Sequence, residues 1–203
     1  MAYDKFKKLS QLSERLGVEY QSQPFLPVIA SIPVSQRLLS DLEDAIHIPL
    51  TTEKSKSEHI VVPVLKELLR DHLNEISYFS GFQFDVDASK DLSGFCDFIL
   101  SAKARQLEVV SPIFCLVEAK NAEIEKGLAQ CGAEMFAAQI YNEREGNPRN
   151  IIFGCVTNAF SWCFLKLEGK NLLIDPNYVP LTFSEPNRVM AILQWVLQSS
   201  LNK

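Results

Sequence analysis

The sequence predicts an α/β domain in which a mixed β-sheet is flanked by helices. Short apolar segments rich in β-branched and aromatic residues, typical of buried strands, lie between longer segments with apolar residues at helical spacing. In the central part of the chain these segments follow the order α, β, β, β, α, β. The chain has 203 residues, of which 47% are hydrophobic, which is enough for one compact domain with its own core.

The first quarter of the chain, residues 1–56, is expected to be an elaboration packed on that core. Apolar residues at helical spacing predict an amphipathic helix over residues 4–16, which Gly17 is suited to end in the left-handed conformation. Residues 21–33 include three prolines and are expected to run extended over the core rather than as a central strand. Ser35 is expected to cap a short helix.

The core is predicted over residues 57–175 and begins with a helix over residues 57–73. Apolar or alternating segments predict the strands that follow, at 76–86, 92–100, 113–120, 151–157, 162–167 and 172–174. A long helix over residues 124–141 separates the third strand from the fourth. Residues 176–203 are expected to hold a last helix, capped by Ser184.

Composition narrows the class of protein. No run of about 18 apolar residues suggests a membrane span, and the N-terminus lacks the pattern of a signal peptide, so a cytoplasmic protein without membrane contact is expected. The five cysteines are scattered and apolar in context, which favours buried free thiols over disulfides or zinc. The net charge of −5 argues against a broad basic surface that coats nucleic acid.

The most unusual feature is an apolar strand that ends in two charges, Glu118 and Lys120. Strand side chains alternate, so these two residues share a face, and burying them costs several kcal/mol unless they are paired or coordinated. Asp97 is a second lone acid within an apolar strand. The polar segment 101–111 allows the two strands to pair as an antiparallel hairpin, so Asp97 and Glu118 are expected to meet at one end.

Two carboxylates and the carbonyl of Ala119 would make an oxygen-only site suited to Mg²⁺ or Mn²⁺. The set Asp97, Glu118 and Lys120 resembles the motif of the PD-(D/E)XK nuclease superfamily, which has an acid on one strand and an acid, any residue and Lys on the next. The resemblance spans about residues 57–167 and implies a restriction-endonuclease-like core. Cys96 stands where many members have Pro.

The resemblance also suggests two supporting residues. Many members carry a Glu near the metal on the first helix, and Glu58 matches that position; as an acid at a helix start it would also favour the helix dipole without any metal. Many members have a Gln on the helix after the motif, and Gln130 matches it. Glu134 lies four residues further on and is expected to pair with Gln130.

The function that this resemblance implies is metal-dependent phosphodiester hydrolysis of nucleic acid, with a DNA endonuclease as the expected form. Asp97, Glu118 and the Ala119 carbonyl would hold one or two Mg²⁺ (or Mn²⁺), supported by Glu58. Lys120 would orient or deprotonate the attacking water and stabilise the transition state, supported by Gln130.

Two alternatives remain open at this point. One is an inactive nuclease-like domain that binds nucleic acid or a protein partner, and the other is a structural protein in which Glu118 and Lys120 form a buried pair. Because both strands of a duplex are cut more easily by two active sites related by a two-fold axis, a homodimer is expected.

Overall fold

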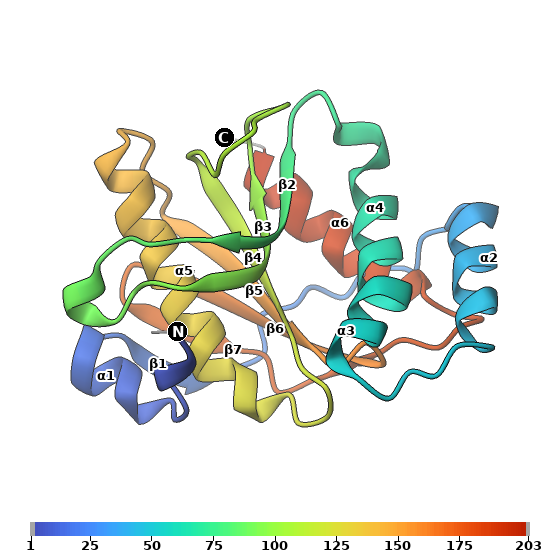
Figure 1. The fold of residues 1–203 in the computed structure, drawn as a ribbon, viewed down its shortest axis with the longest axis horizontal. Helices are drawn as coiled ribbons and strands as arrows, with labels where there is room; N and C mark the ends of the chain where they lie inside the picture. Colours follow the sequence, from blue (N-terminus) through green and yellow to red (C-terminus); the bar gives the residue numbers. More distant parts are fainter. Residues whose placement is uncertain (1–2, 202–203) are drawn as a thin grey trace.

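A computed structural model describes residues 3–201, which form a mixed α/β structure around one eight-stranded sheet (Figure 1). The strands are β1 (Glu19–Ser22), β2 (Ser77–Gln83), β3 (Phe95–Ser101), β4 (Ile113–Ala119), β5 (Ile151–Thr157), β6 (Ser161–Glu168), β7 (Asn171–Ile174) and β8 (Val179–Pro180). Their order is β1-β7-β6-β5-β4-β3-β2, with β8 paired to β6. The β1–β7 and β4–β5 pairs are parallel and the others antiparallel. The predicted α/β class and mixed sheet are confirmed.

Helices cover both faces of this sheet. They are α1 (Ser10–Leu16), α2 (Gln36–Ala45), α3 (Glu53–Lys56), α4 (Val62–Leu69), α5 (Glu125–Arg144) and α6 (Asn187–Leu201). One apolar layer joins the sheet to α1 and α5, and a second joins it to α2, α4 and α6. In the part of the chain that the structure describes, every helix is too short or too polar to cross a membrane.

The first core helix begins earlier than predicted. Glu53 rather than residue 57 is its first residue, because the side chain of Thr52 accepts a hydrogen bond from the Ser55 N–H at 3.1 Å and caps the helix. A π-helical segment, Ser57–Val61, connects α3 to α4. It precedes Pro63, which has no N–H to donate and whose ring crowds the carbonyl four residues back. The wider π-helical turn accommodates these effects, so helical structure continues from α3 through Pro63 into α4.

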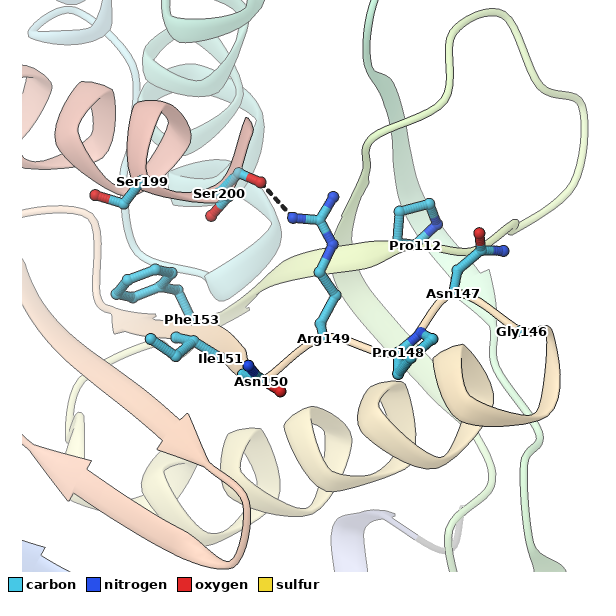
Figure 2. A pocket seen from close by; sticks show the side chains of 10 residues that line it. All are labelled: Pro112, Gly146, Asn147, Pro148, Arg149, Asn150, Ile151, Phe153, Ser199 and Ser200. Atoms are coloured by element: carbon cyan, nitrogen blue, oxygen red, sulfur yellow. Dashed lines mark hydrogen bonds between the residues drawn. The ribbon is translucent and has the colours of Figure 1, made fainter. Parts of the chain in front are cut away.

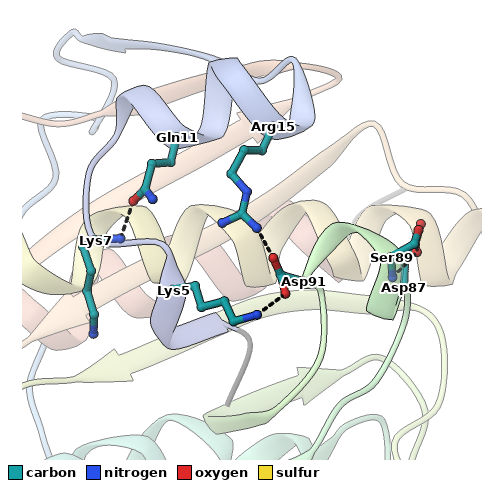
Figure 3. Close-up of polar contacts among 7 residues, drawn as sticks. All are labelled: Lys5, Lys7, Gln11, Arg15, Asp87, Ser89 and Asp91. Atoms are coloured by element: carbon teal, nitrogen blue, oxygen red, sulfur yellow. Dashed lines mark hydrogen bonds and ion pairs between the residues drawn. The ribbon is translucent and has the colours of Figure 1, made fainter.

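The predicted N-terminal helix is interrupted. A 3₁₀ turn, Tyr3–Lys5, is separated from α1 by four residues. The Gln11 side chain accepts hydrogen bonds from the Lys7 and Lys8 N–H groups at 2.7 and 2.9 Å, and so satisfies donors of the link that precedes the helix (Figure 3). The end of α1 is as predicted, because Gly17 is left-handed with φ 65°.

Of the two serines predicted to cap helices, one does so and the other does not. Ser35 caps α2 as predicted, accepting from the Leu38 N–H at 3.2 Å. The prediction for Ser184 is wrong, since α6 begins at Asn187, directly after Pro186. Proline is well suited to the approach to a helix because it lacks an N–H that would need a partner. All five cysteines are free and buried, as predicted.

The β2–β3 hairpin and β4 position Asp97 and Glu118. The strands β3 and β4 are antiparallel with Phe98 opposite Val117, as the sequence predicts. Beyond β2 the connection to β3 swings across α5 (Figure 1), where the rings of Phe84 and Tyr141 pack edge to face at 5.4 Å. After β4 the chain crosses through α5 and returns as β5, parallel to β4. Both β4 and β5 therefore end at the same edge of the sheet.

Candidate active site

Asp97 and Glu118 meet where β3 and β4 part. The Asp97 carboxylate accepts a hydrogen bond from the Ala119 N–H at 2.8 Å, so its side chain takes a place that a strand carbonyl would otherwise fill. The carboxyl groups of Asp97 and Glu118 lie close enough to share a hydrogen bond when one of them is protonated. The structure thus brings together the two acids that the sequence places on neighbouring strands.

Lys120 and α5 complete this cluster. The Lys120 ammonium forms an ion pair with Glu118 and donates a hydrogen bond to Gln130 Oε1 at 3.1 Å. Gln130 Nε2 in turn donates to Glu134 Oε1 at 3.1 Å, as predicted for this pair. Gly127 lets α5 approach this closely, since a Cβ there would lie 2.6 Å from a Val156 methyl carbon and 3.1 Å from the Lys120 side chain.

The cluster contains more buried acid than its donors satisfy. Glu118 and Glu134 are 1% and 0% exposed, and the Oε2 atom of each has no hydrogen-bond partner within the described residues. The two carboxyl groups lie close enough to share a proton. Because an unpaired buried carboxylate is costly, the cluster is stabilised by a proton or by a cation.

The pKa values reflect this imbalance. Burial raises the pKa of Asp97, although the Ala119 N–H and the Lys120 charge act in the opposite direction. Burial and the charge of Glu134 raise the pKa of Glu118 well above its usual range. Burial raises the pKa of Glu134 to about 8. Burial lowers the pKa of Lys120, but the charge and hydrogen bond of Glu118 and the charges of Glu53 and Asp97 together outweigh it, so the net direction is upward and Lys120 is an ammonium at neutral pH.

The structure does not bring Glu58 to this cluster. Its exposed carboxylate lies 3.8 Å from Lys54 Nζ. Glu53, at the start of α3, is close enough that the charges of Lys120 and Asp97 act on it; burial raises its pKa, Lys120 lowers it and Asp97 raises it. The acid of the first helix near the site is therefore Glu53. The sequence contains one indication of this earlier start, because the hydroxyl of Thr52 is suited to cap a helix that begins at Glu53.

The N-terminal 3₁₀ turn borders the same cluster, although the sequence had suggested no chemistry for it. The Tyr3 hydroxyl donates to the Phe84 carbonyl at 2.9 Å, and its N–H to the Ser93 carbonyl at 3.1 Å. The charge of Asp4 consequently reaches Asp97 and raises its pKa.

Asp91 pins this turn in place. Its carboxylate accepts from Lys5 at 2.7 Å and forms a second ion pair with Arg15, so one acid joins the 3₁₀ turn and α1 to the β2–β3 connection (Figure 3). The contacts of Asp91 beside the acid cluster thus join segments 86 residues apart in the sequence.

The segment that follows Lys120 is held from two other elements. The Lys56 ammonium, on α3, donates to the Asn121 carbonyl and lies 6.0 Å from the centre of the Phe160 ring. Asn158, after β5, donates to the Ala122 carbonyl at 2.9 Å. These contacts restrict the backbone next to Lys120 and so limit where its ammonium can lie.

The oxygen atoms of this cluster are of the kind that bind hard divalent cations. Asp97 and Glu118 offer adjacent carboxylate oxygens, one of which has no partner within the described residues, and oxygen donors are those that Mg²⁺ and Mn²⁺ prefer. Within residues 3–201 no group of three or more His, Cys, Asp or Glu side chains is already arranged to hold a metal ion. Mg²⁺ retains several waters and is commonly held by only one or two carboxylates with substrate phosphate, so two acids and a carbonyl remain a sufficient set.

No protein-family model matches this chain, and no curated protein matches it at a significant level. The site itself, in an α/β fold with a mixed sheet, therefore carries the functional argument.

Proposed function

We propose that the chain is a metal-dependent nuclease of the PD-(D/E)XK type that hydrolyses phosphodiester bonds, with DNA as its substrate. The observation that carries the proposal is the meeting of Asp97, Glu118 and Lys120 at one sheet edge, with a buried Glu118 oxygen that has no partner among residues 3–201. A bound cation would satisfy this oxygen, as buried polar groups normally are. The order of elements around the motif supports a restriction-endonuclease-like core.

Under this proposal Asp97, Glu118 and the Ala119 carbonyl hold Mg²⁺ or Mn²⁺, and Glu53 takes the supporting place expected of Glu58. The metal would supply a more acidic water and offset the charge on the phosphorus. Asp97 and Glu118 fix the site in the sheet, since Asp97 is anchored by the Ala119 N–H at 2.8 Å.

Lys120 acts as a cation in this scheme. Its raised pKa keeps a proton on the amine, so it donates to the attacking water or to a phosphoryl oxygen on which charge develops. Gln130 holds the ammonium from the side of α5 at 3.1 Å. Proton removal from the water then falls to a carboxylate or to the substrate phosphate rather than to Lys120.

Cleavage of a panel of linear, nicked, branched and single-stranded DNA, with an RNA of matched sequence, tests the proposal. With Mn²⁺ or Mg²⁺ the parent should cut at least one DNA substrate and EDTA should stop it. Lys120→Ala should cut roughly 10²-fold more slowly, as expected for loss of a catalytic electrostatic group. Lys170→Ala, at the exposed turn between β6 and β7, is the matched control and should cut like the parent.

Equal rates for Lys120→Ala and the parent would remove Lys120 from the chemistry. If no substrate is cut while DNA binding is retained, the chain is a binding domain with a nuclease-like site. We also propose a homodimer, which light scattering at tens of micromolar would test separately from the chemistry; a monomer would exclude it.

A further inference from the structure

A hollow of about 490 Å³ lies at the opposite end of β4 from the acid cluster (Figure 2). It is formed by the loop after α5, the start of β5, the residue before β4 and the end of α6. Its polar lining residues are Asn147, Arg149, Asn150, Ser199 and Ser200. Because β4 has seven residues and a strand rises about 3.3 Å per residue, about 20 Å separates the hollow from Glu118. The two sites are independent.

Arg149 is the only charged side chain that lines this hollow within the described residues. One of its nitrogens, Nη1, donates to the Ser200 carbonyl near the end of α6, which is a favourable place for a cation. Burial alone lowers the pKa of Arg149, and no carboxylate in residues 3–201 offsets that cost. The half-buried guanidinium therefore lacks a counter-charge there.

Several donors of Arg149 and Asn150 have no acceptor among the described residues. Nη2 and Nε of Arg149 form no hydrogen bond with the described part of the chain, and Figure 2 shows the guanidinium extending across the hollow between Ser200 and Pro112. The backbone N–H groups of Arg149 and Asn150 likewise have no acceptor among residues 3–201. A planar guanidinium with two free donor positions matches the paired oxygens of a phosphate or carboxylate.

We propose that this hollow is a binding site for a small molecule that carries a phosphate or carboxylate group, held by a two-point contact with Arg149. The volume is in the range of small-ligand sites, so the ligand extends beyond the oxyanion itself. The apolar side of the hollow, formed by Ile151, Phe153 and Pro112, receives that remaining part. The proposal does not depend on nuclease activity.

Titration of the full chain with inorganic phosphate, and separately with acetate, tests the site by calorimetry and by amide NMR shifts. At about millimolar concentration at least one ion should bind and shift the amides of Gly146, Asn147 and Asn150. Arg149→Gln should abolish binding. Arg149→Lys keeps the charge but loses the planar fork, and should bind at least tenfold more weakly.

Arg144→Gln is the matched control, because Arg144 also donates to a backbone carbonyl, that of Val86 at 2.6 Å, but lies outside the hollow. It should bind the ion like the parent. Since Arg149 also caps α6, Ser199→Phe provides a second variant that fills the hollow with Arg149 intact, and it should block binding.

Unchanged affinity in Arg149→Lys and Ser199→Phe, or absence of any binding by the folded parent, would overturn the proposal. Deletion of residues 202–203 distinguishes the source of the oxyanion. If phosphate binds only after that deletion, the site is filled by the end of the chain and the proposal of a free small-molecule ligand is wrong.

Discussion

Asp175 and Glu118 are both 1% exposed and both lie at the end of a strand or just beyond it, yet their surroundings are opposite. Asp175 accepts from the N–H groups of Phe25, Leu26 and Asn177 and from the Asn177 side chain, at 2.9 to 3.0 Å. Burial raises its pKa, but these four donors outweigh burial and the net pKa is lowered. Glu118 has one cationic partner, an oxygen that no group in the described part of the chain satisfies, and a raised pKa.

The number of hydrogen-bond donors around a buried acid distinguishes one that stabilises the fold from one that is available for chemistry. At Asp175 two donors come from a distant segment and two from its own turn, so the saturated carboxylate fixes the chain after β1 against the turn after β7. At Glu118 neighbouring acids take the place of donors, and the unsatisfied oxygen remains for a proton or a cation. A buried carboxylate thus stabilises the fold at Asp175, whereas at Glu118 one of its oxygens is left unsatisfied by the described residues.

The largest expected effect is at the saturated site. Asp175→Asn places an amide NH₂ among N–H donors, and removing a buried charge from its partners typically costs about 3 kcal/mol or more. Urea unfolding at pH 7 measures this loss. Because the folded pKa of Asp175 is lowered, its stabilising effect is present above the unfolded value near 3.8 and is lost as pH falls through the folded value. The difference from the parent should therefore shrink in acid, and a constant difference would contradict this account.

Asp97→Asn should behave in the opposite way. The pKa of Asp97 is raised by burial, so a neutral residue that can still accept from the Ala119 N–H should melt no lower than the parent in EDTA at pH 7. Mn²⁺ near 100 times its dissociation constant adds about 2.7 kcal/mol to the parent, or roughly 5 to 10 °C. The variant should lose most of this gain. Equal shifts in both proteins, together with a clear loss of stability in EDTA, would make Asp97 a structural acid.

Glu134→Gln tests the excess of acid through pH. The folded pKa of Glu134 is raised to about 8, so the stability it contributes is complete below the unfolded value near 4.5 and is lost as pH rises to about 8. The variant and the parent should melt alike near pH 5. Near pH 8.5 without metal, the variant should be more stable by roughly 1 kcal/mol or more, which is at least about 2 °C. A parallel pH dependence in the two melting curves would mean that Glu134 has the same pKa in the folded and unfolded states, and would contradict the raised value.

The smallest effect is expected at Asp91, an acid on the surface rather than in the core. Asp91→Asn keeps a residue type that tolerates the left-handed backbone at φ 58° and removes two ion pairs with partly exposed partners. Such pairs contribute about 1 kcal/mol or less and are weakened by salt. Thermal unfolding at low and high salt should show a small loss that salt removes. A loss as large as that of Asp175→Asn would mean that the N-terminal turn is a main support of the fold.

Local pattern was enough to predict several of these features. The alternation of side chains along two strands and the polar link between them predicted that Asp97 and Glu118 meet, and the resemblance to the nuclease motif suggested that Gln130 faces the site. The caps at Gly17 and Ser35 also follow from residues within one helical turn. Each of these depends on neighbours in the sequence or on the pairing of consecutive strands.

Tertiary structure decided what depends on distant segments. Glu53 rather than Glu58 approaches the cluster because a π-helical segment and an earlier cap set the position of the first helix. Glu134, which local spacing presents only as a partner of Gln130, lies against Glu118 because α5 packs closely on β5 at Gly127. Asp175 and Arg149 acquire their roles from chain segments about 150 and 51 residues away. Burial and hydrogen-bond saturation are properties of such long-range packing, so a short stretch of sequence determines which side chains are present but not which of them lack a partner.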